Sequence, residues 1–235
     1  MTRGRWVSLF SGGKDSSWAL YRALQEGLDV GRLVTVHPEP DSYMYHVPAT
    51  DLAALAAESI GIPLLDVDQA GAGGETSGER GDAEVEPLEA ALRELAPELG
   101  GVAGLTVGAV ESEFQTSRIE ALCRRLGADL YAPLWQADPV TLAEQMLDAG
   151  FEITIVQVAA YGLDESWVGR RLDRDALEEL RELHDDYGVH VLGEGGEFET
   201  LVTDAPHMDR PLEITGTTRW EGDRGHLEIS DAGLG

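Results

Sequence analysis

The sequence predicts an α/β protein with a five-stranded parallel sheet, followed by a smaller C-terminal α+β domain. Three observations indicate this. Short apolar runs alternate with amphipathic helical segments through the first half of the chain. A turn rich in glycine and serine joins the first apolar run to the first helical segment. After Trp135 the alternation gives way to a long apolar run and a C-terminal hairpin pattern, so we place a domain boundary between residues 1–135 and 136–235.

The elements of the first half follow from periodicity and from the residues that bound it. Apolar runs of four to seven residues, bounded by Gly, Pro or charged residues, predict strands over 6–10, 33–37, 63–67, 104–110 and 130–133. Apolar residues at helical spacing predict helices over 15–26, 51–60, 86–95 and 113–126. Residues 69–81, QAGAGGETSGERG, have no periodicity and predict a loop, which is either a tolerated surface insertion or a lid over a substrate.

The second half predicts fewer helices and more extended structure. Helices are expected over 141–149 and 173–187, a long apolar strand over 151–160, and a short strand over 189–192 that opens into GEGGEFETLV. Residues 212–218 and 226–229 predict the two strands of an antiparallel hairpin.

Composition narrows the class of protein. The 235 residues carry a formal net charge of −27, from 44 acidic and 17 basic residues. This charge disfavours direct binding of nucleic acid, whose phosphates need clustered Lys and Arg, and it indicates adaptation to high intracellular salt. The single cysteine, Cys123, excludes an internal disulfide, and no apolar run approaches the roughly 18–20 residues of a membrane span. We therefore expect a soluble, cytoplasmic protein without a membrane partner.

The glycine-rich turn carries the strongest chemical signal. It reads Ser11-Gly12-Gly13-Lys14-Asp15-Ser16, and Lys14 is the only lysine in the chain. Such a turn before a helix directs backbone N–H groups and the helix N-terminus at an anion, and its glycines let a phosphate approach the backbone. The two serines add hydroxyl donors and Lys14 adds a compact positive charge. A carboxylate at Asp15 suits phosphates when Mg²⁺ lies between them.

This turn lacks the Gly-x-x-x-x-Gly-Lys-Ser/Thr spacing of a Walker A loop. It resembles the SGGxDS PP-loop of the N-type ATP pyrophosphatases, enzymes that cleave ATP between the α and β phosphates. The resemblance implies a Rossmann-like, adenine nucleotide alpha hydrolase-like domain over residues 1–135 that binds ATP and Mg²⁺.

Cysteine usage separates the classes within that superfamily. Thiolases and sulfonucleotide reductases need reactive cysteines, whereas Cys123 shares the spacing of a buried helix face with Ile119, Leu122 and Leu126. No glutaminase nucleophile is evident either. These features favour an AMP-forming amide ligase that uses free ammonia.

Three further segments resemble the diphthine–ammonia ligase family. They are GAVESEFQTSRIEALCRRLGADLYAPLW at 108–135, GEGGEFETLV at 193–202, and SYMYHVP at 42–48, so the resemblance spans most of the chain. Phe114 stands where the family usually has Tyr, Thr116 where a basic residue is common, and Glu199 where the family often has His.

The resemblance implies ATP-dependent amidation of diphthine, a modified histidine of translation elongation factor 2, through an acyl-adenylate. The nucleotide-binding residues it implies are Ser11, Gly12, Gly13, Lys14, Asp15, Ser16, His37, Gly108 and Ser112, with Asp15 holding Mg²⁺. The catalytic residues are Lys14, Asp15, Gln115, Arg118, Glu194 and Glu197, and the substrate contacts are His46, Trp135, Glu199 and Thr200. Glu194 or Glu197 would hold ammonium, or share the trimethylammonium of diphthine with Trp135.

Two other interpretations stay open at this point. One is another PP-loop ligase or a tRNA-modifying enzyme, and the other is a regulator that binds ATP or AMP without turnover. The expected partners are elongation factor 2 carrying diphthine and ammonium, and the sequence leaves a homodimer open.

Overall fold

A computed structural model describes residues 4–37, 49–68, 77–109 and 113–235. Side chains are described for all of these residues except 49–51, 77–84 and 113–116. Contacts divide the chain into two compact units that do not follow chain order. The first comprises residues 1–11, 15–42 and 62–135, and the second comprises 12–14, 43–61 and 136–235. Each unit is built around its own sheet.

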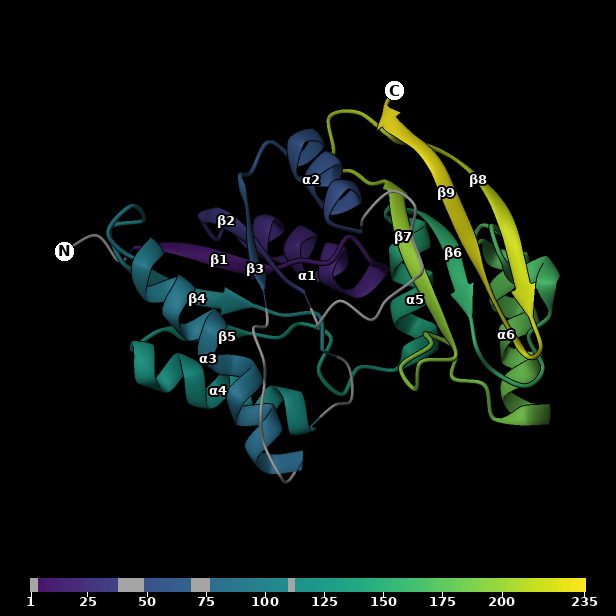
Figure 1. Ribbon diagram of the computed structural model, residues 1–235, viewed down its shortest axis with the longest axis horizontal. Helices are drawn as coiled ribbons and strands as arrows, with labels where there is room; N and C mark the ends of the chain where they lie inside the picture. The colour runs from purple at the N-terminus through teal and green to yellow at the C-terminus, as the bar shows by residue number, and fades with distance from the viewer. Residues whose placement is uncertain (1–3, 38–48, 69–76, 110–112) are drawn as a thin grey trace. The chain divides into compact units, whose positions relative to one another are not determined.

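The first sheet is parallel throughout and has the order β3-β2-β1-β4-β5 (Figure 1). Its strands are β1 (Arg5–Leu9), β2 (Val30–His37), β3 (Leu64–Asp68), β4 (Val102–Thr106) and β5 (Asp129–Tyr131). The expected five-stranded parallel sheet is confirmed. Because strand order reverses at β1, the carboxyl ends of β1 and β4 form the topological switch point at which such sheets bind ligands.

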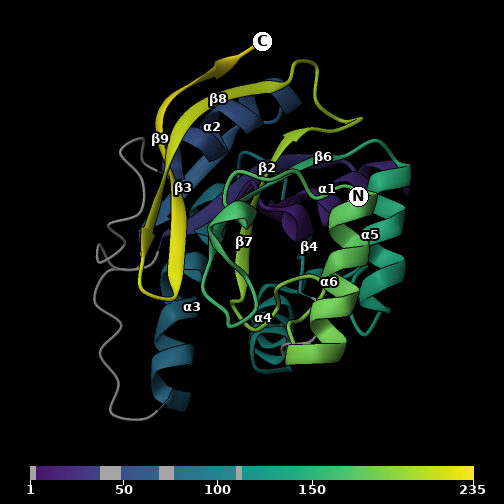
Figure 2. The same ribbon diagram turned by 90° about the vertical axis from the view of Figure 1, so that its right-hand side faces the viewer.

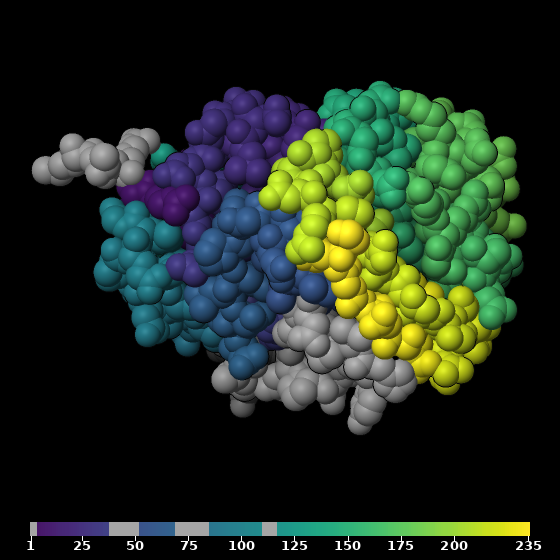
Figure 3. Space-filling model, turned by 90° about the horizontal axis from the view of Figure 1, so that it is seen from above, coloured from purple at the N-terminus to yellow at the C-terminus, as the bar shows by residue number. Residues whose placement is uncertain are grey.

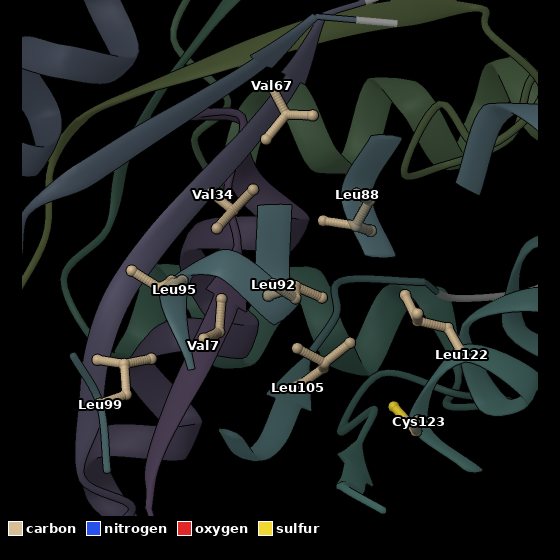
Figure 4. Close-up of a cluster of buried hydrophobic side chains, with 10 residues drawn as sticks. All are labelled: Val7, Val34, Val67, Leu88, Leu92, Leu95, Leu99, Leu105, Leu122 and Cys123. Carbon is tan, nitrogen blue, oxygen red and sulfur yellow. The ribbon is translucent and has the colours of Figure 1, made fainter. Parts of the chain in front are cut away.

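Helices α1 (Lys14–Gln25), α3 (Ser77–Leu95) and α4 (Glu113–Leu126) supply the other layers of this unit. Leu88, Leu92 and Leu95 of α3 pack with Leu122 and Cys123 of α4 over apolar side chains of the strands (Figure 4). Cys123 is 3% exposed, which confirms the buried position expected from its spacing. Burying each leucine of this cluster contributes about 1.5–3 kcal/mol to the stability of the fold.

Helix α3 corrects one expectation from the sequence. It begins at Ser77, so the last five residues of the expected loop over 69–81 are helical, and residues 69–76 lie outside the described part. Gly78, Gly81 and Pro87 all lower helix propensity, and the sequence predicted a helix only from residue 86. Packing of the three leucines farther along the helix outweighs these local preferences.

The second sheet is antiparallel with the order β7-β6-β9-β8 (Figure 2). It comprises β6 (Glu152–Val158), β7 (Phe198–Asp204), β8 (Leu212–Glu221) and β9 (Arg224–Leu234), with helices α2 (Ala49–Ile60), α5 (Pro139–Asp148), α6 (Arg174–Tyr187) and the 3₁₀ turn η1 (Glu165–Trp167) in the same unit. Strands β8 and β9 form the expected hairpin, which is longer than its apolar pattern and lies on the surface of this unit (Figure 3). The expected α+β class of the C-terminal part is confirmed.

Local chemistry fixes the ends of these helices. Asp138 and Asp173 accept backbone N–H groups at the starts of α5 and α6, and Gly188 ends α6 in the left-handed conformation. Helix α2 is held by Ser59, whose hydroxyl donates to the Arg210 carbonyl at 2.5 Å. Each aspartate cap contributes about 1 kcal/mol to helix stability.

One expectation for the second half was wrong, and one strand was not predicted. Residues 189–192 do not form a strand, because the chain turns at 191–192 with the Leu192 N–H donating to the His190 ring. Strand β7 was not predicted, because its polar residues come in the adjacent pairs Glu199-Thr200 and Thr203-Asp204 and leave neither a strict alternation nor a continuous apolar run. Its pairing with β6 supplies the stability that this pattern did not reveal.

Within the described part of the chain, none of the helices is both long and apolar enough to cross a membrane.

Candidate functional site

The carboxyl ends of β1 and β4 bring the glycine-rich turn beside the segment that follows β4. A Cβ added at Gly108 would lie 2.5 Å from the carbonyl carbon of Asp15 and 2.6 Å from the amide nitrogen of Ser16. These separations are below any real Cβ contact, so only glycine lets this backbone meet the start of α1. Gly108 therefore lies directly against the start of α1, and its contact with a nucleotide stays a prediction.

The backbone and hydroxyl groups of the turn lie close together at the start of helix α1. Gly12 has φ of +82°, a conformation that glycine adopts without strain. The Ser11 N–H donates to Ser16 Oγ at 3.2 Å, and the two hydroxyls lie 3.1 Å apart. Helix α1 begins at Lys14, so the partial positive charge of its N-terminus is at the turn, and Oδ1 of Asp15 in its first turn is buried.

Strand β7 holds residues 12–14 of the turn. The Val202 N–H donates to the Gly12 carbonyl at 2.9 Å, and the Lys14 N–H donates to Thr200 Oγ1 at 3.2 Å. Because β7 is an edge strand of its sheet, its free backbone groups are available for this pairing. The turn is thus fixed by residues 186 or more positions away in the sequence.

The side chain of Lys14 is buried, with 3% exposure, and its Nζ lies 5.8 Å from the centroid of the Phe198 ring. Burying an ammonium group is costly unless other groups compensate for the lost water. The negative face of an aromatic ring provides part of that compensation. Phe198 and Thr200 are two residues apart on β7, so their side chains lie on the same face of the strand. One strand therefore positions both the backbone and the side chain of Lys14.

Residues 190–197 form a compact loop leading into β7. The Nδ1 atom of His190 accepts from the N–H groups of Leu192, at 3.1 Å, and Glu194, at 3.3 Å. The carboxylate of Glu197 accepts from the N–H groups of His190, at 3.1 Å, and Gly195, at 2.8 Å. Glu197, predicted as a catalytic residue, therefore shapes the loop, and His190 is a partner that the sequence did not single out.

Glu199 and Gln157 are cross-strand neighbours on β7 and β6. Burial raises the pKa of the Glu199 carboxyl above its ordinary value. The Oε1 atom of Gln157 is buried and accepts no hydrogen bond from any described residue. Thr200 follows Glu199 on β7, and its hydroxyl accepts from the Lys14 N–H. Of the predicted substrate residues, Glu199 and Thr200 thus lie on the strand that contacts the turn.

The remaining predicted residues are distributed more widely. His37 ends β2 and its Nε2 lies 2.8 Å from Oδ1 of Asp66. Arg118 lies on α4 with its Nε buried, and Trp135 is half-buried after β5. Gln115 lies on α4 but its side chain is outside the described part, as are His46 and Ser112 entirely.

Two observations bear on the kind of chemistry. Burial raises the pKa of the Cys123 thiol to about 11, which opposes formation of a thiolate nucleophile. Among the described residues, no group of three or more His, Cys, Asp or Glu side chains could hold a metal ion. A single carboxylate at Asp15 fits Mg²⁺ that is carried mainly by substrate phosphates.

Comparison with known proteins relates this arrangement to one family. The family model for the diphthamide synthase N-terminal domain matches residues 4–130, and the model for the C-terminal domain matches residues 138–234. The chain belongs to the diphthamide synthase family. Both the glycine-rich turn and β7 lie within these matches, so the paired elements of the site are family segments.

Individual members agree with this assignment. The chain is 35% identical over 225 residues to a protein of Danio rerio named diphthine–ammonia ligase, covering 91% of this chain and 87% of the relative. It is 37% identical over 223 residues to the Rattus norvegicus protein of that name, and 37% over 224 residues to the Homo sapiens one. In both of these comparisons the match covers 89% of this chain and 82% of the relative.

Proposed function

We propose that this protein is an ATP-dependent diphthine–ammonia ligase that converts diphthine on translation elongation factor 2 to diphthamide. The observation that carries the proposal is the buried Lys14 at the SGGKDS turn, fixed by Thr200 and Phe198 of β7. Relatives similar over most of their length are named for this activity. Charge and cysteine burial are consistent with it, because they disfavour a tRNA substrate and a thiol-dependent reaction.

In the proposed reaction, an oxygen of the diphthine carboxylate attacks the α-phosphorus of ATP and pyrophosphate leaves. The resulting acyl-adenylate is attacked at its carbonyl carbon by ammonia, which loses a proton as AMP departs. The product is a carboxamide. Each step breaks one bond to a good leaving group, so no oxidant or further co-reactant is required.

The turn contributes where negative charge develops. As pyrophosphate leaves, charge grows on its oxygens, and donors already directed at that position stabilise it without reorganisation. We assign this role to Lys14, the N–H groups at the start of α1, and the hydroxyls of Ser11 and Ser16. Asp15 would hold Mg²⁺ on the phosphates, and the metal would neutralise part of the same charge.

Strand β7 has a positioning role in this proposal. Thr200 fixes the backbone of Lys14 and Phe198 flanks its ammonium group, whereas Glu197 and His190 shape the loop that leads into them. Glu199, with its raised pKa, is the candidate for taking a proton from ammonium, because a carboxylate that binds protons more tightly is a stronger base.

The other predicted residues keep their proposed roles. We assign Gln115 and Arg118 of α4, and Gly108, Ser112 and His37 at strand ends, to ATP or the substrate carboxylate. Trp135, Glu194 and His46 are assigned to diphthine, with an aromatic face suited to its trimethylammonium group.

The direct test incubates the protein with elongation factor 2 bearing diphthine, ATP, Mg²⁺ and ammonium. We expect the mass of the factor to change from that of a carboxylate to that of an amide, with AMP and pyrophosphate formed in equal amounts. A factor bearing unmodified histidine is the matched control and should give neither product. Formation of ADP, or AMP formation that ignores the state of the factor, would contradict the proposal.

A further inference from the structure

A hollow of about 440 Å³ lies beyond the end of β6, and no step of the proposed reaction uses it. Its lining includes Tyr161, Tyr187, Leu163, Leu183, Asp164 and Asp223. The two tyrosines are the large hydrophobic side chains that stand exposed among the described residues, with exposures of 82% and 52%. Exposed aromatic groups gathered around a hollow mark a binding surface more often than chance.

The aromatic wall is held in place by its surroundings. The two tyrosine rings meet edge to face with centroids 5.3 Å apart. A Cβ at Gly162 would lie 2.9 Å from Cδ2 of Tyr187, and Gly162 has φ of +102°, so glycine makes room for that ring. Tyr187 is the last residue of α6, which anchors it to a helix. The wall is therefore formed before any ligand arrives.

Two carboxylates accompany the rings. Asp164 accepts from the backbone N–H of Ser166 at 2.9 Å and from its hydroxyl at 2.5 Å, and these bonds lower the pKa of the Asp164 carboxyl. Asp223, in the turn between β8 and β9, has a side chain 92% exposed, and its Oδ1 lies 3.8 Å from Nε of Arg224 in an exposed ion pair. The hollow thus combines aromatic surface with negative charge.

We propose that this hollow receives an arginine or lysine side chain from a basic segment of the protein substrate. Aromatic rings and carboxylates together bind such cations, and arginine also stacks on rings. The net charge of −27 attracts a basic protein and repels nucleic acid. The proposal rests on the proposed function, because an enzyme that modifies one residue of a folded protein needs a second surface to hold that protein.

The test measures binding of diphthine-bearing elongation factor 2 without ATP, by titration calorimetry, for the wild type and three variants. Tyr161→Ala removes one ring and Asp223→Lys reverses one charge. We expect each to weaken binding roughly 3- to 30-fold. Tyr161→Phe keeps the ring and should bind like the wild type. Glu213→Lys, an exposed charge reversal at the other end of β8, is the matched control and should have little effect.

Kinetics provide the second readout. In Tyr161→Ala and Asp223→Lys the KM for the factor should rise, while kcat and the KM values for ATP and ammonium stay at wild-type levels. Wild-type binding by both variants would overturn the proposal. A Tyr161-dependent affinity for tetramethylammonium chloride, with unchanged affinity for the factor, would also overturn it, because the hollow would then bind a small quaternary ammonium.

These outcomes separate the two proposals. Amidation by the wild type together with Tyr161-independent binding would remove the docking surface and leave the ligase function. Tyr161-dependent binding of the factor without any amidation would remove the ligase function and leave the docking surface. Circular dichroism of each variant confirms folding, which a residue as exposed as Tyr161 should not disturb.

Discussion

At the scale of single residues, Lys14 has the most unusual combination of residue type and burial in the site. The chain has 16 arginines among its 17 basic residues, yet the basic residue of the SGGKDS turn, which is buried, is a lysine. An arginine carries the same charge in a larger, planar head group. With 3% exposure and an aromatic ring 5.8 Å from Nζ, the site has little room for that change.

Lys14→Arg should therefore retain ATP binding but lose about 10²-fold in kcat, the usual cost of displacing one transition-state donor. Isotope exchange between pyrophosphate and ATP measures the adenylation step, and equilibrium dialysis measures ATP binding. Arg22→Lys, an exposed change on the same helix, is the control. Wild-type exchange by Lys14→Arg would show that the position needs only a positive charge.

His207 provides a second test, of stability and not of activity. Burial lowers the pKa of His207 from 6.5 to about 4, and its ring lies 5.6 Å from that of Phe151. Between these two pH values, His207 is protonated in the unfolded chain and neutral in the folded protein. The free energy of unfolding should thus fall as pH falls through this window, by up to about 3 kcal/mol from this group.

His207→Phe keeps an aromatic ring but removes the titration, so it should lose less stability between pH 6.5 and pH 4 than the wild type. Urea unfolding at several pH values measures the difference, and His226→Gln controls for loss of a histidine. Parallel pH profiles for His207→Phe and the wild type would contradict this assignment.

At the scale of elements, β7 connects the two family segments of the site. Its edge supplies the Val202 N–H to Gly12, and its Thr200 hydroxyl accepts from Lys14. The sequence predicted the turn, because the chemistry of SGGKDS is local. It did not predict β7 as a strand or its pairing with the turn, because that contact joins residues 186 positions apart and has no periodic signal.

Thr200→Val keeps the shape of the side chain but removes the acceptor, so the Lys14 N–H loses its partner. We expect kcat to fall about 10-fold, corresponding to roughly 1.4 kcal/mol, the usual scale of one hydrogen bond. Thr200→Ser keeps the hydroxyl and should restore most of the activity, which a purely structural role would not predict. Thr203→Val removes the 3.2 Å bond to the Glu152 carbonyl on the same strand and is the matched control. Equal losses in Thr200→Val and Thr203→Val would contradict the positioning role.

Helix α3 and the 190–197 loop also depend on contacts that the sequence pattern does not reveal. Two glycines and a proline concealed the first turns of α3, since packing by leucines 11 or more residues after Ser77 decides the outcome. The loop depends on a histidine ring accepting two N–H groups, and a lone histidine in the sequence does not indicate such a role.

At the scale of the whole molecule, alternation of apolar runs and helical segments was sufficient to predict the five-stranded parallel sheet. That pattern reflects burial of both faces of the sheet, which is most complete in the central strands β1, β2 and β4. Division of the chain into compact units was harder to anticipate. Residues 12–14 and 43–61 cluster with the C-terminal part, and such clustering depends on contacts between distant segments.

The net charge of −27 predicts how stability depends on salt. Like charges repel in the compact state, and added salt screens that repulsion over a shorter distance. The Tm should therefore rise with KCl concentration, by about 2–4 °C for each kcal/mol gained. Differential scanning calorimetry across a KCl series measures this, with glycerol as the uncharged control. A Tm that is constant or falls with KCl would contradict the prediction.

The central claim is that the chain adenylates a carboxylate at the SGGKDS turn before amide formation. The most direct measurement uses diphthine-bearing elongation factor 2 whose diphthine carboxylate carries isotopically labelled oxygen, with ATP, Mg²⁺ and ammonium. Adenylation predicts that one labelled oxygen appears in the phosphate of AMP for each amide formed. Label found instead in inorganic phosphate, or in water with unlabelled AMP, would contradict it.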